Sequence, residues 1–345
     1  ESPTVGNLDW DFNLFYLEIF VRPLRDFHQL PLWNPYSMGG FPINIHPGIK
    51  SFGPDTLLAL LFGTLTGAKL TVILHYGVGF TGAWYLTRRV LGFSLWPVLF
   101  FSFFWLYSGW LPLHLYAGHA NFSPILYAPF VVAFFIQAVR RNNLWYAVAA
   151  GFVLEIMLLS AAFYAVVYIL IAGGVYVCAH ELIRRPGLIT GPSTARVFLL
   201  SAGAFLVLSA HRWIPLLLYA TGGAGFHDFP DDSGHSLAQV WQMFTDRTGD
   251  PEAVQWAGQP YLWWEYGNYT GAYFWIVLIG LSFFIRRGDI PIVIVCCILL
   301  LLVLGDFAQW SPYNIMRALE IPILRHLRVP SRWSMPLLFT TAILG

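Results

Sequence analysis

Long apolar blocks recur along this chain, and they restrict its fold more than any other feature. Hydrophobic residues make up 57% of the 345 residues and charged residues only 11%, whereas about a quarter of the residues of a soluble protein are charged. The blocks approach the roughly 20 residues that cross a hydrocarbon core as a helix. A membrane barrel would show short alternating segments instead. The sequence therefore predicts an all-α polytopic membrane protein.

We expect about nine membrane-spanning helices, each with an apolar block of its own. The predicted spans are Leu70–Leu86, Ser94–Trp110, Phe122–Val139, Leu144–Leu159, Ala162–Ala179, Val197–Ala210, Ala272–Ile285, Ile290–Leu304 and the beginning of another at Trp333. The stretch from Asp55 to Phe62 is too short to span and predicts an interfacial or re-entrant helix. Because the chain starts in a polar run and ends inside an apolar block, we expect it to be a piece of a longer polypeptide, cut at both ends.

Arginines gather in short, alternate connections between these spans: Arg88, Arg89, Arg140, Arg141, Arg184, Arg185, Arg196, Arg286 and Arg287. The positive-inside rule places those connections in the cytoplasm, so the long polar loops lie outside. The prediction is a first extracytoplasmic loop with interfacial helices (1–69), membrane helices (70–212), a folded extracytoplasmic loop (213–269), membrane helices (270–304), an extracytoplasmic loop with an Arg-Val-Pro-Ser-Arg motif (305–332) and the start of a further helix (333–345). The connection 111–121 is expected to be a further outer loop.

Charge and cysteine content exclude two classes of function. The formal net charge is +1 and there is no basic stripe, so nucleic acid is not an expected partner. Cys178, Cys296 and Cys297 fall in apolar blocks, where a thiol behaves as a small buried hydrophobe. They indicate neither a disulfide framework nor a metal site.

Two acids, Asp9 and Asp11, open the first polar run beside Trp10 and Phe12. A carboxylate among aromatic side chains near a membrane interface can have a raised pKa and serve as a general base. The alternative is a helix N-cap or a solvated loop acid. The Pro- and Gly-rich segment from Trp33 to Pro42 that follows has the composition of a structural turn.

Several basic side chains are candidates for binding a phosphate, as is expected of a site for an anionic lipid. His46 and Lys50 follow the turn segment, and His119 closes a tight connection, where its alternative role is a helix cap. Arg is well suited to phosphate because of its planar fork of donors. The arginine candidates are Arg212, at an outer helix end, and Arg328 with Arg332, which would share a face if helical. Snorkelling of Arg328 and Arg332 into lipid headgroups is the alternative for that pair.

Two further groups of residues have both a functional and a structural interpretation. Oxygen and nitrogen ligands at close spacing predict either a divalent metal site or a mobile acidic loop over His227, Asp228, Asp231, Asp232 and His235. Glu155 lies inside a predicted span, where an acid is by default a functional hypothesis. The small residues near it, such as Gly151, make helix packing an equal alternative.

An ordered series of short motifs resembles the YfhO-like family of bacterial membrane proteins, which belongs with the GT-C class of polyprenyl-phosphate-sugar-dependent glycosyltransferases. The series consists of an acid in the first outer loop, Leu30-Pro31-Leu32-Trp33-Asn34-Pro35-Tyr36, Gly39-Gly40-Phe41-Pro42, Phe52-Gly53-Pro54, Gly118-His119, Ile214-Pro215, Tyr269-Thr270-Gly271 and Leu327-Arg328-Val329-Pro330-Ser331-Arg332. The chain departs from the family pattern at Ser160-Ala161-Ala162-Phe163, where the family has a Gly-His-Pro-like turn, and at Arg212-Trp213, where it has a Gln.

The resemblance implies a GT-C-like bundle of transmembrane helices with long extracytoplasmic loops, in the bacterial cytoplasmic (inner) membrane. It implies transfer of a sugar from an undecaprenyl-phosphate carrier to an extracytoplasmic acceptor, with Asp9 or Asp11 as the catalytic acid. Arg328 and Arg332, with His119 or Arg212, would stabilise the departing lipid phosphate. The donor is then the polyprenyl-phosphate-linked sugar, no cofactor is firmly indicated, and divalent-metal dependence is open.

Two other functions remain open from the sequence. The first is a non-catalytic lipid-binding or scaffold subunit of a larger membrane complex, whose partners would be membrane lipids and membrane proteins. The second, a transporter, is the weaker of the two, because the spans hold few charges and there is no paired inverted repeat.

Overall fold

The computed structural model describes residues 8–37, 39–183, 193–221, 234–249, 256, 258–319, 321, 324 and 327–344. Among these residues almost all regular structure is helical, and the strands form one hairpin of two residues a side. Three helical stretches are long and apolar enough to cross a membrane, at Leu95–Tyr116, Ala120–Arg141 and Phe163–Ile183. A fourth is added if Thr194–Leu208 and Ala210–Leu218, which meet at 76°, form one broken span. The predicted helical class is confirmed for the described residues, and three or four of the helical stretches are long and apolar enough to cross a membrane.

Helices lie at each segment that the sequence predicts as a span: α3 (Thr64–Trp84), α4 (Leu95–Tyr107), α6 (Ala128–Arg141), α7 (Trp145–Leu159), α8 (Phe163–Ile183), α9 (Thr194–Leu208), α13 (Tyr273–Phe284), α14 (Ile290–Leu304) and α17 (Ser334–Leu344). Some are short. The 12 residues of α13 rise about 18 Å, less than a hydrocarbon core of about 30 Å. Helix α3 has the length but carries polar side chains such as Lys69 and His75, and it is not among the sufficiently apolar helices.

The chain divides into two compact units. Unit 1 comprises Glu1–Ser94, His114–Val167 and Leu199–Ala224, and unit 2 comprises Leu95–Leu113, Tyr168–Phe198 and Gly225–Gly345. Each unit therefore draws on segments that are distant in the sequence.

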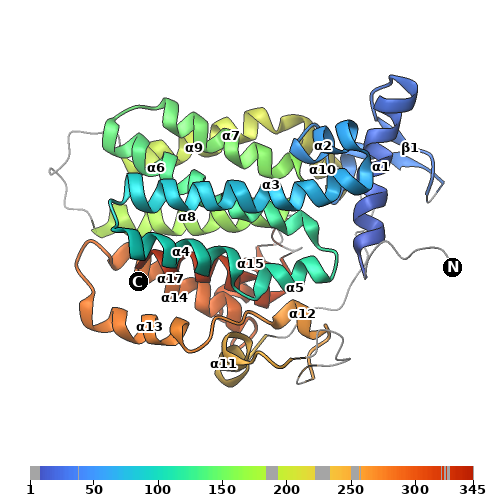
Figure 1. Cartoon of the computed structure of the whole chain (residues 1–345). Coiled ribbons are helices and arrows are strands. Elements are labelled where there is room, and N and C mark those ends of the chain that lie inside the picture. The colour runs from blue at the N-terminus through green and yellow to red at the C-terminus, as the bar shows by residue number, and fades with distance from the viewer. Residues whose placement is uncertain are drawn as a thin grey trace. The chain divides into compact units, whose positions relative to one another are not determined.

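Unit 1 begins with α1 (Trp10–Phe27), an amphipathic helix that packs against α2 (Pro54–Phe62) and α3 (Figure 1). Their shared core consists of Leu17, Val21, Ala59 and Ala68. Pro54 starts α2 at a position where its missing N–H costs nothing, and Gly63, with φ of +81°, separates α2 from α3. Gly67 brings the two backbones close together, since a Cβ there would lie 2.5 Å from the Cα of Ala59. The short apolar helix predicted over 55–62 is confirmed.

The turn segment between α1 and α2 forms a hairpin, as its composition predicts. Strand β1 (Trp33–Asn34) pairs antiparallel with β2 (Phe41–Pro42). The Asn34 side chain accepts a hydrogen bond from the backbone N–H of Tyr36, and Gly40 has φ of +94°. A Cβ at Gly40 would lie 2.6 Å from the indole nitrogen of Trp33, so both its backbone conformation and the close packing require glycine.

The other helices of unit 1 continue from α3. A six-residue π-helix, η2 (Tyr85–Val90), ends that helix, and the 3₁₀ segment η3 (Ala120–Tyr127) leads into α6. Helices α6 and α7 pack against each other through a short connection in which Asn142 adopts a left-handed conformation with φ of +49° (Figure 1). Gly151 on α7 lies against α9, because a Cβ there would lie 2.6 Å from the carbonyl oxygen of Ser201.

In unit 2, α17 packs against α4, α13 and α14. Trp105 on α4 stacks edge-on against Phe339 on α17, with ring centroids 4.8 Å apart. Three short helices also belong to this unit: α11 (Leu237–Thr245), capped by Ser236, α12 (Trp263–Tyr266) and α15 (Pro312–Ala318). The short 3₁₀ helix η4 (Pro330–Trp333) leads directly into α17.

Two expected loops begin later than predicted. The segment predicted as a loop over 111–121 is helical in its first half, as α5 (Trp110–Tyr116). Pro112 lies in the first turn of α5, where proline is tolerated, so it does not break the helix. Likewise α10 (Ala210–Thr221) extends into the expected loop 213–269. Within that segment, Phe244 of α11 and Trp263 and Tyr266 of α12 are buried.

Candidate active site

Asp9 occupies the N-cap position of α1, but its side chain makes no capping hydrogen bond. Its carboxylate oxygen Oδ2 instead lies 2.9 Å from Nε2 of His119, which precedes η3. The Asp9 side chain is 50% exposed and that of His119 only 13%. The imidazole is therefore held in place by its surroundings, while the carboxylate stays accessible to a solute.

The backbone around Asp9 is fixed on the connection that carries His119. The N–H of Asp9 donates to the carbonyl of Ala117 at 2.9 Å, and Nε1 of Trp10 donates to the carbonyl of Leu115 at 2.7 Å. The side chain of Asn13 donates to the carbonyl of Gly118. Such multiple attachment places the two side chains in a defined geometry before any ligand binds, as catalysis requires.

Gly118 makes this close approach possible. Its φ is +85°, a conformation that disfavours residues with a Cβ. A Cβ there would also lie 2.2 Å from the backbone nitrogen of Trp10. The Gly118-His119 pair is therefore structurally coupled: the glycine admits the start of α1, and the histidine next to it contacts Asp9.

Asp11, the alternative catalytic acid, lies two residues further along, in the first turn of α1, and is exposed. An acid in the first turn is stabilised by the helix dipole, which is an ordinary structural role. Of the two candidates, the structure brings Asp9 to His119.

His46 lies beside α1, where it contacts Tyr16, a residue on the same face of the helix as Asp9. Asp9, Asn13 and Tyr16 follow each other at spacings of four and three, which align them along the helix. The hydroxyl oxygen of Tyr16 lies 3.2 Å from Nε2 of His46. The pKa of Tyr16 is raised, first by burial and then by the negative charge of Asp9. Asp9 and Tyr16 thus interact electrostatically.

The hydrogen bonds of His46 determine its protonation state. The N–H of Gly48 donates to Nδ1 at 3.2 Å, so Nδ1 is an acceptor and the ring proton is on Nε2, which donates to the Tyr16 oxygen. Burial, and next the charge of Arg212, lower the pKa of His46 to about 4. His46 is therefore neutral at pH 7 and does not offer the positive charge expected of a phosphate ligand.

Arg212 is buried on α10, where it is 4% exposed. Its Nη2 donates to the carbonyl of Ile49 at 2.6 Å and to that of His46 at 3.4 Å. The remaining nitrogens, Nε and Nη1, are buried and make no hydrogen bond among the described residues. Arg212 acts electrostatically on Glu155, which is 5% exposed on α7. Glu155 therefore has a charged neighbour as well as the helix packing considered from the sequence.

Lys50 is also buried, at 3% exposure, and its ammonium donates to Oδ1 of Asp55. Burial opposes the ionisation of Asp55, but the electrostatic effect of its neighbours, Lys50 foremost, outweighs it, so the pKa of Asp55 is lowered. Lys50, which the sequence suggests as a phosphate ligand, is thus paired inside unit 1 with the carboxylate of Asp55.

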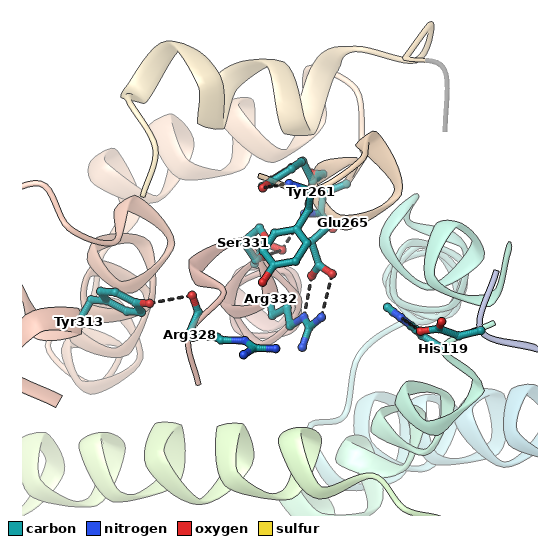
Figure 2. A network of polar contacts seen from close by, with 11 residues as sticks. His119, Tyr261, Glu265, Tyr313, Arg328, Ser331 and Arg332 are labelled. Atoms are coloured by element: carbon teal, nitrogen blue, oxygen red, sulfur yellow. Dashed lines mark hydrogen bonds and ion pairs between the residues drawn. The ribbon is translucent and has the colours of Figure 1, made fainter. Parts of the chain in front are cut away.

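In unit 2, Arg332 forms a two-point ion pair with Glu265 (Figure 2). Its Nε lies 2.6 Å from Oε1 and its Nη2 lies 2.8 Å from Oε2. Glu265 is fully buried on α12. This pairing satisfies the forked geometry of the guanidinium, so Arg332 already has an anionic partner within the protein.

Arg328 lies just before the helical turn that contains Arg332. Its carbonyl accepts a hydrogen bond of 2.7 Å from the hydroxyl of Tyr313 (Figure 2). The backbone at Val329 is extended and η4 begins only at Pro330, because proline disfavours helix at the residue before it. The helical spacing considered for Arg328 and Arg332 is therefore not present.

Four of the five residues considered for a metal site, His227, Asp228, Asp231 and Asp232, lie outside the described residues. The fifth, His235, is buried, and its backbone N–H donates to the carbonyl of Leu304 at 2.9 Å. Burial lowers the pKa of His235 to about 4, and the charge of Glu265 opposes this shift.

Sequence reasoning missed several polar residues that the structure brings to these sites. Asn13 bridges α1 to Gly118, and its signal was its position one helical turn after Asp9. His75 and Ser123 lie next to the Lys50 and Asp55 pair, but both are single polar residues inside predicted apolar spans, a position typical of helix packing. Glu265 sits in an aromatic run, Trp263-Trp264-Glu265-Tyr266. A lone acid among aromatics is a signal that could have been followed.

Comparisons of the chain with models of protein families, with curated proteins and with solved structures found no match.

Proposed function

We propose that the chain is a membrane glycosyltransferase of the GT-C class, similar to the YfhO-like family. It would move a sugar from a polyprenyl-phosphate carrier to an acceptor outside the cytoplasmic membrane of a bacterium. The observation that supports this proposal is the half-exposed carboxylate of Asp9, which contacts His119 instead of capping its own helix. Of the two acids that the resemblance implies, this geometry favours Asp9.

The proposed reaction begins with the acceptor hydroxyl at the carboxylate of Asp9. Asp9 takes the hydroxyl proton as a general base while the acceptor oxygen forms a bond to the anomeric carbon of the sugar. The bond between that carbon and the lipid phosphate breaks, and the phosphate leaves with the bonding electrons. His119, by donating its Nε2 proton to Oδ2, holds the carboxylate in position and leaves Oδ1 to accept the proton.

The phosphate would need positive donors as charge develops on it. Arg212 suits this role best among the arginines of the proposal, because two of its guanidinium nitrogens are buried without a hydrogen-bond partner among the described residues. Arg332 suits it less, since Glu265 already neutralises its charge. Arg328 and His119 remain in the proposal as further donors, whereas neutral His46 and the buried, paired Lys50 have no role in it.

The experiment uses the purified chain in proteoliposomes with radiolabelled polyprenyl-phosphate sugars. Release of polyprenyl phosphate is measured for the wild type, Asp9→Asn and Asp11→Asn. The expected result is that Asp9→Asn loses transfer by about 10²-fold or more, in keeping with the usual contribution of a general base. It should bind the donor as well as the wild type, and Asp11→Asn, the matched control, should remain active.

Full activity of Asp9→Asn would exclude this assignment of the base. The wild type would also be tested with a series of donor sugars and with membrane extracts as the source of acceptor. If it bound the donors but transferred no sugar, the non-catalytic lipid-binding subunit would be favoured instead.

A further inference from the structure

Three ionisable side chains meet inside unit 1, and the proposed reaction uses none of them. The ammonium of Lys50 donates to Oδ1 of Asp55, and the other carboxylate oxygen, Oδ2, lies 3.7 Å from Nε2 of His75. Asp55 and His75 are fully buried, and Lys50 is nearly so. An arrangement of charges so far from water is costly unless each is compensated, so their protonation states are constrained.

The hydrogen bonds of Ser123 identify the tautomer of His75. The Ser123 hydroxyl donates its only proton to the carbonyl of Ala120 at 2.7 Å. Toward Nδ1 of His75, 2.5 Å away, its oxygen must therefore accept, so the ring proton is on Nδ1. In a neutral imidazole this leaves Nε2 without a proton.

Two hydrogen-bond acceptors consequently face each other across a buried gap. Neither Oδ2 of Asp55 nor Nε2 of His75 has a hydrogen-bond partner among the described residues. A proton on Nε2 would turn this unfavourable contact into an ion pair. A metal cation is a poorer occupant, because the ammonium of Lys50 lies on the same carboxylate.

The groups around the pair do not supply that proton. The ring of Tyr127 stacks edge-on against His75, with centroids 5.4 Å apart, and Asp55 acts electrostatically on this phenol. The hydroxyl of Ser160 faces the same carboxylate. Both are weak acids in water, so Lys50 and His75 are the two bases that compete for a proton beside Asp55.

A small cavity lies beside the cluster. Lys50 and Ser123 line it, together with Asn13, Trp10 and Thr71. Its volume is about 10 Å³, no more than one water molecule needs, and most of its surface comes from apolar side chains such as Leu14 and Leu17. The cavity therefore borders the first turns of α1, and it contacts Lys50 of the cluster and Ser123, the hydrogen-bond partner of His75.

We infer that Lys50, Asp55 and His75 form a buried proton-binding site, in which Asp55 lies between two nitrogen bases that share one proton. The proton is on Nζ of Lys50 in the present geometry, and it moves to Nε2 of His75 when Lys50 cannot carry it. In either state the cluster has no net charge, as burial favours. The ligand is a proton, and the site is independent of the proposed transferase activity.

The test is ¹⁵N NMR of histidine in the full chain in detergent micelles, with the His75 signal assigned from its loss in His75→Gln. In Lys50→Met at pH 7, His75 is expected to change from a mostly neutral imidazole to a mostly charged imidazolium. The control is Lys69→Met, which removes an exposed lysine from α3, the helix that carries His75. This variant should leave His75 neutral. A neutral His75 in folded Lys50→Met at pH 7 overturns the inference.

A second measurement applies even if Lys50→Met does not fold. The double variant Lys50→Met/Asp55→Asn removes both charges together, which avoids an unpaired buried charge. On acidification His75 of the wild type takes up a second proton beside the Asp55 carboxylate, and this should occur at a higher pH than protonation of His75 in the double variant, which has no carboxylate there. Identical titration of His75 in the two proteins contradicts a proton site built on Asp55.

Discussion

The Oδ2 atom of Asp9 lies 2.9 Å from Nε2 of His119, across 110 positions of sequence. Asp9 is the N-cap residue of α1, where an aspartate usually accepts a hydrogen bond from the backbone of the first turn. Here the carboxylate forgoes that local bond for a distant one. The cost in helix stability is about 1 kcal/mol by the usual worth of a cap, and the bond gained in exchange is charge-assisted in character.

Gly118→Ala should destabilise unit 1 by more than the strain of a positive φ alone. The new methyl group would meet the backbone of Trp10, whereas a methyl group at Gly92, with φ of +80°, would meet nothing within 4 Å. We expect a loss of about 1 kcal/mol for Gly92→Ala and at least about 2 kcal/mol for Gly118→Ala. Thermal unfolding of the two variants in detergent measures the difference, and equal losses would show that α1 does not pack tightly at Gly118.

Glu265→Gln should be strongly destabilising, because it leaves the Arg332 guanidinium paired with a neutral amide in a largely buried place. Breaking a buried ion pair costs about 3 kcal/mol or more. The charge-free double variant Glu265→Leu/Arg332→Met should recover much of this loss. Thermal denaturation of the single and the double variant measures these losses. The control is Asp26→Asn, which breaks the exposed ion pair of Asp26 with Arg25. A double variant no more stable than Glu265→Gln would refute the ion-pair explanation.

Acidification should destabilise the protein through His46. Its pKa is about 4 in the folded protein and about 6.5 when unfolded, so between these values the unfolded state binds more protons. The contribution is fully present above pH 6.5 and is lost as the pH falls toward 4, by up to about 3 kcal/mol. His46→Gln should reduce the slope of melting temperature against pH. Part of the slope should remain in His46→Gln, because the pKa of His235 is also lowered to about 4.

His28→Asn is the control for this pH dependence. His28 is exposed, with φ of +53°, a conformation that asparagine tolerates. Its substitution should leave the slope unchanged. If His46→Gln and His28→Asn gave the same pH profile as the wild type, protonation of His46 would not limit stability in acid.

The helices of the fold could be predicted because apolar blocks near 20 residues long have few alternatives. The breaks within them could not. Ser108 and Gly109 separate α4 from α5, yet the helix resumes at Trp110, because Pro112 falls in a first turn that tolerates it. In the same way, the bend of 76° before Ala210 has no proline at the break itself that would mark it in the sequence.

The candidate site could be predicted residue by residue, but its pairings could not. Asp9 and His119 were both candidates, and what joins them is the left-handed backbone of Gly118, which a sequence does not display. Lys50 was a candidate for phosphate, but the carboxylate of Asp55 on α2 binds it instead. Asn13, His75 and Glu265 are single polar residues in apolar or aromatic surroundings, so only their neighbours in space reveal their partners.

The most direct test of the proposed base is the single-turnover transfer rate of four proteins: the wild type, Asp9→Asn, His119→Gln and Asp9→Asn/His119→Gln. If His119 acts by holding the carboxylate of Asp9, the two residues form one unit and their losses are not additive. We predict that the double variant is no slower than Asp9→Asn, and that His119→Gln alone loses less than Asp9→Asn. Independent losses that multiply in the double variant, or a rate for Asp9→Asn equal to that of the wild type, would contradict this account.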